Sequence, residues 1–176
     1  MKLLSIAGLL WGAASAQAIE LKLLSQDLQE GALMHKRHEF HGFGCAGENL
    51  SPQLSWQHLP KGTKSIAVTA YDPDAPTGSG WWHWLVVDIP ASVNELPRGV
   101  EVTAIKGRSI RNDFGVTAFG GACPPPGHGM HRYQFTVWAL PVEKLPLAAE
   151  PSAALVGYML NQQALAKATL TATYHQ

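Results

Sequence analysis

Apolar and polar positions alternate with a period of two along residues 64–72, and this alternation predicts a β-strand. Ile66, Val68 and Ala70 share one face of the expected strand, and Asp72 continues the same parity at its end. We therefore expect the Asp72 side chain at the end of this strand, on the same side as the three apolar residues.

Two further segments, residues 81–89 and 131–140, show the same period. Both faces of the first are largely apolar, which indicates a strand in the middle of a sandwich. Its expected faces are Trp81, His83, Leu85 and Val87 on one side and Trp82, Trp84 and Val86 on the other. In the second segment one side holds His131, Tyr133, Phe135 and Val137.

The remaining segments predict smaller elements around these strands. Residues 19–24, 100–105 and 169–174 are short strand candidates. From Ser152 to about residue 167 the period becomes helical, and Ser152 after a proline is a good N-cap. The expected apolar stripe contains Leu155, Met159, Gln162 or Gln163, and Ala166. The chain shows no internal repeat, so we predict one β-rich domain.

The first 18 residues have the composition of an export signal. Lys2 precedes an apolar run from residue 3 to about residue 14, and Ala16-Gln17-Ala18 matches a cleavage site. The run is short for a membrane anchor, which is the alternative. We predict a signal peptide over residues 1–18, a single domain over residues 19–176, and export to the periplasm or the medium.

The net charge, the hydropathy and the two cysteines indicate which partners and which compartment suit this chain. Thirteen basic and thirteen acidic residues give a net charge of zero, which argues against a nucleic-acid partner. No segment after the leader is apolar enough to predict a transmembrane helix. In an oxidising compartment Cys45 and Cys123 are expected to form one disulfide, and two buried free thiols are the alternative.

Four side chains with hydrogen-bonding chemistry belong to the three central strands: Asp72, His83, His131 and Tyr133. The adjoining turns, DPDAP and CPPPG, are rigid because proline fixes φ. We interpret these residues as a pocket for a small anion, in which histidines and a tyrosine hydroxyl donate hydrogen bonds. The alternative is a pair of ordinary turns beside histidines that are satisfied within the core.

Other groups are expected to complete this pocket. Backbone N–H groups of residues 120–123 would add donors in the manner of an anion nest. Asp72 would repel an anion, so we expect it to orient a histidine and to raise the pKa of that histidine. Trp81 and the prolines would form apolar walls that strengthen polar contacts.

Three rival sites are not supported by the sequence around them. Residues 42–47 match G-x-G-x-x-G, but Asn49, Ser51 and Pro52 follow where a dinucleotide site requires a helix. His35, His38 and His41, or His128 with His131, could bind a metal, but the first set would alternate between the faces of a strand and its spacing is not a recognised catalytic pattern. Ser79 and Ser109 lack the sequence of a nucleophile elbow. We therefore predict no catalytic residue, no metal and no cofactor.

Two blocks of the chain, residues 71–90 and 120–135, resemble the signature blocks of the phosphatidylethanolamine-binding protein family, also called the Raf-kinase-inhibitor-like family. The resemblance is greatest to its exported bacterial branch. NLSPQLSW at residues 49–56 and RNDFG at residues 111–115 also fit. The similarity therefore covers nearly the whole chain after the leader.

The resemblance implies a mainly β (α+β) fold, an antiparallel β-sandwich with peripheral helices, one of them near the C-terminus. It also implies a small anion pocket near one end of the sandwich. Carried over by motif, the pocket residues are Asp72, Asp74, Trp81, His83, Pro124, Pro125, His131 and Tyr133, with Gly121 and Cys123 supplying backbone groups.

From the residues and the resemblance we predict a non-catalytic binding protein, Raf-kinase-inhibitor-like, whose pocket holds a small anion or a phosphorylated headgroup. The alternative is an inhibitor or modulator of a partner kinase or peptidase that acts through the pocket rim. A protein partner and a homodimer both stay open at this point.

Overall fold

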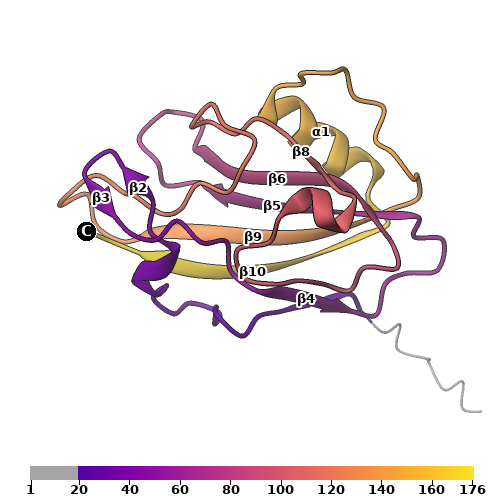
Figure 1. Cartoon of the computed structure of the whole chain (residues 1–176), viewed down its shortest axis with the longest axis horizontal. Helices are drawn as coiled ribbons and strands as arrows, with labels where there is room; N and C mark the ends of the chain where they lie inside the picture. The colour runs from indigo at the N-terminus through magenta and orange to yellow at the C-terminus, as the bar shows by residue number, and fades with distance from the viewer. Residues whose placement is uncertain (1–19) are drawn as a thin grey trace, which may run out of the picture.

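The computed structural model describes residues 20–176, so the expected leader over residues 1–18 lies outside the described residues (Figure 1). None of the helices in the described range is long and apolar enough to cross a membrane. The elements in chain order are β1 (Lys22–Leu24), the 3-10 turn η1 (Lys36–His38), β2 (His41–Gly42), β3 (Cys45–Ala46), β4 (Leu54–Gln57), β5 (Ser65–Asp72), β6 (Trp81–Pro90), β7 (Glu95–Leu96), the 3-10 turn η2 (Val102–Ile105), β8 (Arg108–Ser109), β9 (His131–Leu140), α1 (Ala153–Gln163) and β10 (Ala166–Tyr174).

A five-stranded antiparallel sheet in the order β10-β9-β5-β6-β8 forms the centre of the molecule. The smaller sheet β1-β4-β7 packs on one face of it, and α1 packs on the other (Figure 1). β2 and β3 form a separate hairpin at one end. This arrangement confirms the predicted mainly β sandwich with a helix near the C-terminus.

Two apolar layers result, and both faces of the central strands are buried as their composition predicts. The layer between the sheets includes Leu54, Trp56, Ile66, Val68, Trp84, Val86, Tyr133, Phe135 and Val137. The layer under α1 includes Ala67, Leu85, Val87, Trp138, Leu140, Val156 and Leu160. β5, β6 and β9 are thereby held rigidly, and their shared end carries the predicted pocket residues.

A β-bulge in β6 overturns one prediction about its faces. Trp81 and Trp84 are three positions apart, yet they pair with β5 residues only two positions apart. Beyond the bulge the parity is reversed, so Trp84 enters the layer between the sheets while Leu85 packs under α1 with Trp82. Both faces of β6 are apolar, so alternation alone could not reveal the extra residue at His83.

The predicted strand over residues 100–105 is wrong, because this segment forms the turn η2. Gly99 and Lys106 at its ends have left-handed φ values of 66° and 58°. These conformations turn the chain at both ends and prevent an extended strand. The alternating valines instead pack along the edge of the core.

The helix α1 is confirmed, with Ser152 as its N-cap: the Leu155 N–H donates to the Ser152 hydroxyl at 3.2 Å. Its predicted apolar stripe and its end near residue 167 are wrong. Leu155 is 44% exposed, because the face that meets the sheet consists of Ala153, Val156, Gly157 and Leu160. β10 begins at Ala166, earlier than expected, since pairing with β9 extends it.

Candidate functional site

A cavity of about 220 Å³ lies where β5, β6 and β9 meet the proline-rich loops. Eight of the ten predicted pocket residues line it, and Asp74 and Gly121 do not. The lining residues are Phe43, Asp72, Ala75, Pro76, Thr77, Trp81, His83, Phe114, Cys123, Pro124, Pro125, His131 and Tyr133. The sequence therefore identified the strands that build this cavity.

Asp72 pairs with His131, and both side chains are almost fully buried. The His131 Nδ1 atom lies 2.7 Å from the Asp72 Oδ2 atom. A carboxylate only accepts hydrogen bonds, so Nδ1 carries a proton. The His131 Nε2 atom lies 2.7 Å from Nδ1 of His128, in an exposed loop. Asp72 thus orients a histidine, as expected from the sequence.

His83 is held in one orientation by two backbone carbonyls. Its Nδ1 atom lies 2.8 Å from the Gly120 oxygen and 3.1 Å from the Gly121 oxygen, so Nδ1 is a donor. Burial lowers the pKa of His83, although these carbonyls and Asp72 act in the opposite direction. In the neutral ring that burial favours, Nε2 carries a lone pair and accepts hydrogen bonds.

Three polar atoms of the lining residues have no hydrogen-bond partner within the described chain. The Trp81 Nε1–H and the Tyr133 hydroxyl are buried and unpaired, and His83 bonds only through Nδ1. Burial raises the pKa of the Tyr133 hydroxyl, and the Asp72 carboxylate adds to this shift. Tyr133 therefore remains protonated and able to donate.

The predicted anion nest at residues 120–123 is wrong for three of its N–H groups. Gly120 donates to the His83 oxygen at 3.0 Å and Ala122 to the His38 oxygen at 3.1 Å. Gly121 donates to the Asn49 Oδ1 atom at 2.7 Å. Gly121 thus acts through its carbonyl, which positions His83. A side chain at Gly121 would collide with the His38 carbonyl oxygen, which explains the glycine.

Asp74 lies outside the cavity and is paired with Arg132. Its carboxylate accepts from the Arg132 backbone N–H and from Nε, both at 2.9 Å, and from a terminal guanidinium nitrogen at 2.7 Å. Arg132 lowers the pKa of Asp74 to about 2. The Asp74 backbone N–H in turn donates to the Asp72 Oδ1 atom at 2.8 Å. Asp74 therefore shapes the turn beside the cavity through its backbone.

Asp74→Asn is expected to leave the affinity of the cavity for sulfate within about twofold of the unmodified protein. Exposed ion pairs contribute little, and the variant keeps the backbone N–H that reaches Asp72. Isothermal titration of both proteins with sulfate measures this. A larger loss of affinity would show that the Asp74 carboxylate acts on the ligand directly.

Two aromatic walls of the cavity were not among the predicted site residues. The Phe114 ring lies 5.3 Å from the His83 ring and 5.9 Å from the Phe43 ring, measured between centroids. Phe114 belongs to RNDFG, a block that the resemblance included without a role. Phe43 lies in the glycine-rich loop with φ 53°, which is uncommon for a bulky residue. That outlier is visible only in the folded chain.

Cys45 and Cys123 form a disulfide, with Cα atoms 6.0 Å apart, which confirms the predicted pairing. The bond joins β3 to the loop that precedes the CPPPG prolines. Cys123 lines the cavity, as does Phe43 at the tip of the same hairpin. The disulfide therefore holds an aromatic wall against the strands that carry the polar groups.

Comparison with known proteins agrees with these observations. Residues 24–175 match the family described as phosphatidylethanolamine-binding protein. The chain is 52% identical over 168 residues to the UPF0098 protein YbcL of Escherichia coli (strain K12), covering 91% of this chain and 90% of YbcL. It is 47% identical over 158 residues to the UPF0098 protein YbhB of the same organism, covering 88% and 99%.

The crystal structure of E. coli YbcL, described as a new member of the mammalian PEBP family, matches with a TM-score of 0.84 at 50% identity. The match covers 90% of this chain and 99% of YbcL. Family model, sequence and structure therefore agree over almost the same residues. The chain belongs to the phosphatidylethanolamine-binding protein family.

Proposed function

We propose that this protein binds a small phosphoryl anion, free or as a phosphorylated headgroup, without converting it. The observation that supports this most directly is that the buried Trp81 N–H and the Tyr133 hydroxyl have no partner in the described chain, and that His83 bonds only through Nδ1. Buried polar groups in folded proteins almost always have partners, so an unpaired set around one cavity indicates a ligand. The cavity volume of about 220 Å³ suits a ligand of phosphoryl size.

The charges of the site indicate how such an anion is bound. No Lys or Arg is among the described residues that line the cavity, and Asp72 contributes a carboxylate. The Trp81 N–H and the Tyr133 hydroxyl would donate to phosphoryl oxygens. The His83 Nε2 atom would accept from a protonated phosphoryl oxygen, or take up a proton itself. Binding is therefore expected to bring one proton into the site.

Catalysis of ester hydrolysis is not part of the proposal, because the lining residues include no activated nucleophile. The Thr77 hydroxyl donates to the Gly80 oxygen at 2.5 Å, and Cys123 is held in the disulfide. Tyr133 keeps its proton for the reason given above. A nucleophile needs an adjacent base or a lowered pKa, and none of these groups has either.

Tyr133→Phe is expected to weaken binding of orthophosphate and phosphoethanolamine by about tenfold or more, since a hydrogen bond to a charged group is lost. Calorimetric titration measures both ligands. Tyr71→Phe is the matched control, because its hydroxyl donates to the Ser79 oxygen outside the cavity. Equal affinities in all three proteins, or no binding by the unmodified protein, would refute the phosphoryl site.

The same preparations separate a binding protein from an enzyme. We expect no turnover of phosphate or carboxylate esters beyond that of a blank. Ester turnover that disappears in His83→Ala would show that the site is catalytic. That result would overturn the non-enzymatic assignment while leaving the binding measurement valid.

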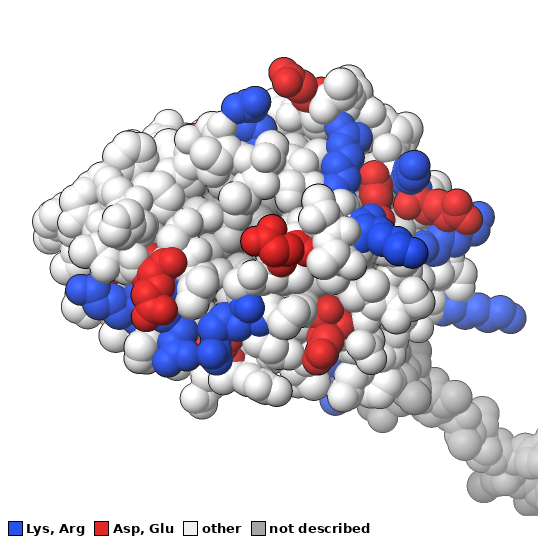
Figure 2. Space-filling model, viewed as in Figure 1, with Lys and Arg blue, Asp and Glu red and all other residues white. Residues whose placement is uncertain are grey.

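A second candidate function, modulation of a partner protein through the pocket rim, is favoured by exposed apolar side chains there. Phe43 is 79% exposed and Met130 is 54% exposed. Few charged side chains lie near the β2–β3 hairpin on the face seen in Figure 2. If the rim inhibits a kinase or a peptidase, Met130→Ser should weaken inhibition without altering phosphate affinity by more than about twofold, since Met130 is exposed and does not line the cavity.

We also propose that the protein is exported. The apolar N-terminal run with its Ala16-Gln17-Ala18 site supports export, and so does a disulfide, which persists in oxidising compartments. The mature chain is then expected to begin at Ile19. N-terminal sequencing of the protein from its own cells measures this, and an intact leader would contradict it.

A further inference from the structure

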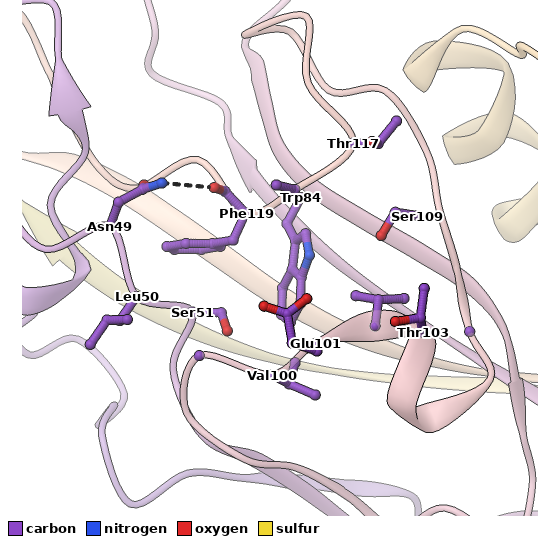
Figure 3. A pocket seen from close by; sticks show the side chains of 14 residues that line it. Asn49, Leu50, Ser51, Trp84, Val100, Glu101, Thr103, Ser109, Thr117 and Phe119 are labelled. Carbon is purple, nitrogen blue, oxygen red and sulfur yellow. Dashed lines mark hydrogen bonds between the residues drawn. The ribbon is translucent and has the colours of Figure 1, made fainter.

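A second cavity, of about 410 Å³, lies between β6, η2 and the segment of residues 117–119. It shares no lining residue with the cavity described above. Figure 3 shows it from outside, with Trp84 at the back and the Glu101 carboxylate seen in front of it. The chemistry of its lining differs from that of the phosphoryl site.

One wall of this cavity is the indole of Trp84. Trp84 is only 1% exposed, and its Nε1–H makes no hydrogen bond within the described chain. By contrast, the Trp56 Nε1–H donates to the Val93 oxygen at 3.1 Å, and the Trp138 Nε1–H donates to the Thr69 hydroxyl at 3.0 Å. A donor without a protein partner, in the wall of a cavity, is free to bind a ligand atom that accepts from it.

Four hydroxyl side chains surround the same space: Ser51, Thr103, Ser109 and Thr117. None of these hydroxyls takes part in a hydrogen bond between described residues, and Ser51 is only 3% exposed. Ser51 and Ser109 lie on opposite sides of the indole in Figure 3. Each hydroxyl can both donate and accept, so the set matches a ligand whose groups also do both.

Charge in this cavity is limited to one exposed carboxylate. Glu101 is the sole ionisable lining residue in the described chain, and it forms no ion pair there. The amide of Asn49 is already used, since it donates to the Phe119 oxygen at 3.1 Å and accepts from Gly121. Asp72 in the first cavity is paired with His131, whereas Glu101 has no such partner in the described chain, so its charge disfavours phosphoryl ligands in this cavity.

We propose that this cavity is a second binding site, for a small neutral polyhydroxylated molecule such as a monosaccharide or a cyclic polyol. The hydroxyl set and the Trp84 N–H would pair with ligand hydroxyls, and Glu101 would accept two of them. Val100, Val102 and Phe119 offer apolar surface for the C–H groups of such a ligand. An organic cation fits less well, because one exposed carboxylate holds it only weakly.

Titration of the ¹⁵N-labelled protein with D-glucose, N-acetyl-D-glucosamine and myo-inositol tests this. The indole N–H signals are followed by NMR, and Trp84→Phe identifies the signal of Trp84. Ligand is added up to roughly 100 mM, enough to detect binding weaker than millimolar. At least one of the three is expected to shift the Trp84 signal saturably while leaving the Trp81 signal in place.

Glu101→Gln is expected to weaken that binding by about threefold or more, since a hydrogen bond to a charged group is replaced by one to a neutral amide. Glu95→Gln in β7 is the matched control, because Glu95 is exposed and lies outside the cavity. An unmoved Trp84 signal with all three ligands overturns the proposal. So does an equal affinity in both variants, or a shift produced by putrescine and by none of the three polyols.

Discussion

Replacing Cys45 and Cys123 together with alanine is expected to lower the free energy of unfolding by ~4 kcal/mol. The disulfide links residues 78 positions apart, so its loss restores a large conformational freedom to the unfolded chain. Urea unfolding of the variant and of the unmodified protein measures the change. A serine pair at the same positions is the control for the packing of the alanines.

The same double variant is expected to bind phosphate more weakly, because the disulfide holds Phe43 and Cys123 at the cavity. Intact mass before and after reduction and alkylation shows whether the cysteines are bonded in protein from its own cells. If both thiols react without prior reduction, the stabilisation does not exist there. A variant of unchanged stability would show that the loop is ordered without the bond.

Sulfate affinity is expected to fall as pH rises, by up to about tenfold per pH unit where one proton is taken up on binding. In the free protein burial lowers the pKa of His83, so its ring is neutral near pH 7. A bound dianion beside Nε2 stabilises the charged ring and raises that pKa in the complex. Between the two pKa values the complex holds one proton more than the free protein.

The direction of the His83 shift sets the pH window. An ordinary histidine titrates at about 6.5. Because burial lowers the free-state pKa of His83, the loss of affinity should begin below that value. Sulfate is the probe because its own charge is constant over this range, whereas phosphate titrates within it.

Calorimetric titration with sulfate from about pH 5 to about pH 8, the range in which histidines change charge, measures the dependence. His83→Gln should flatten the curve and weaken binding at acid pH. His175→Gln, at an exposed position near the C-terminus, is the matched control. His128 and His131 also lie at the site, so a curve unchanged in His83→Gln would assign the proton to one of them. A flat curve in the unmodified protein would exclude a cationic histidine.

Much of the fold and of the site could be predicted from local features of the chain. Alternation over eight to ten residues located β5, β6 and β9, since a strand with buried faces must repeat every second residue. It placed Asp72, His83, His131 and Tyr133 in those strands, and all four line the cavity. Ser152 as an N-cap and the single cysteine pair were likewise evident from residue type and position.

The other features of the fold and of the site depend on contacts between segments that are distant in sequence. A period-two pattern contains no information about such contacts. The bulge at His83 follows from pairing with β5. Asp72 pairs with His131, which lies 59 positions away in the chain. His83 donates from Nδ1 to the Gly120 carbonyl, 37 positions away, and this leaves Nε2 as the acceptor. Phe43 reaches the cavity because a disulfide brings its hairpin there.

The residue types of the site are therefore a property of the local sequence, whereas their protonation and pairing are a property of the fold. Hydrophobic periodicity is a local consequence of strand geometry, and it can be recognised in a single segment. A hydrogen bond between strands requires their register, which only the packed sheets establish. For this reason the local sequence predicts that His83 is a pocket residue. Only the folded chain places the Gly120 and Gly121 carbonyls against Nδ1, which leaves Nε2 of the neutral ring as an acceptor.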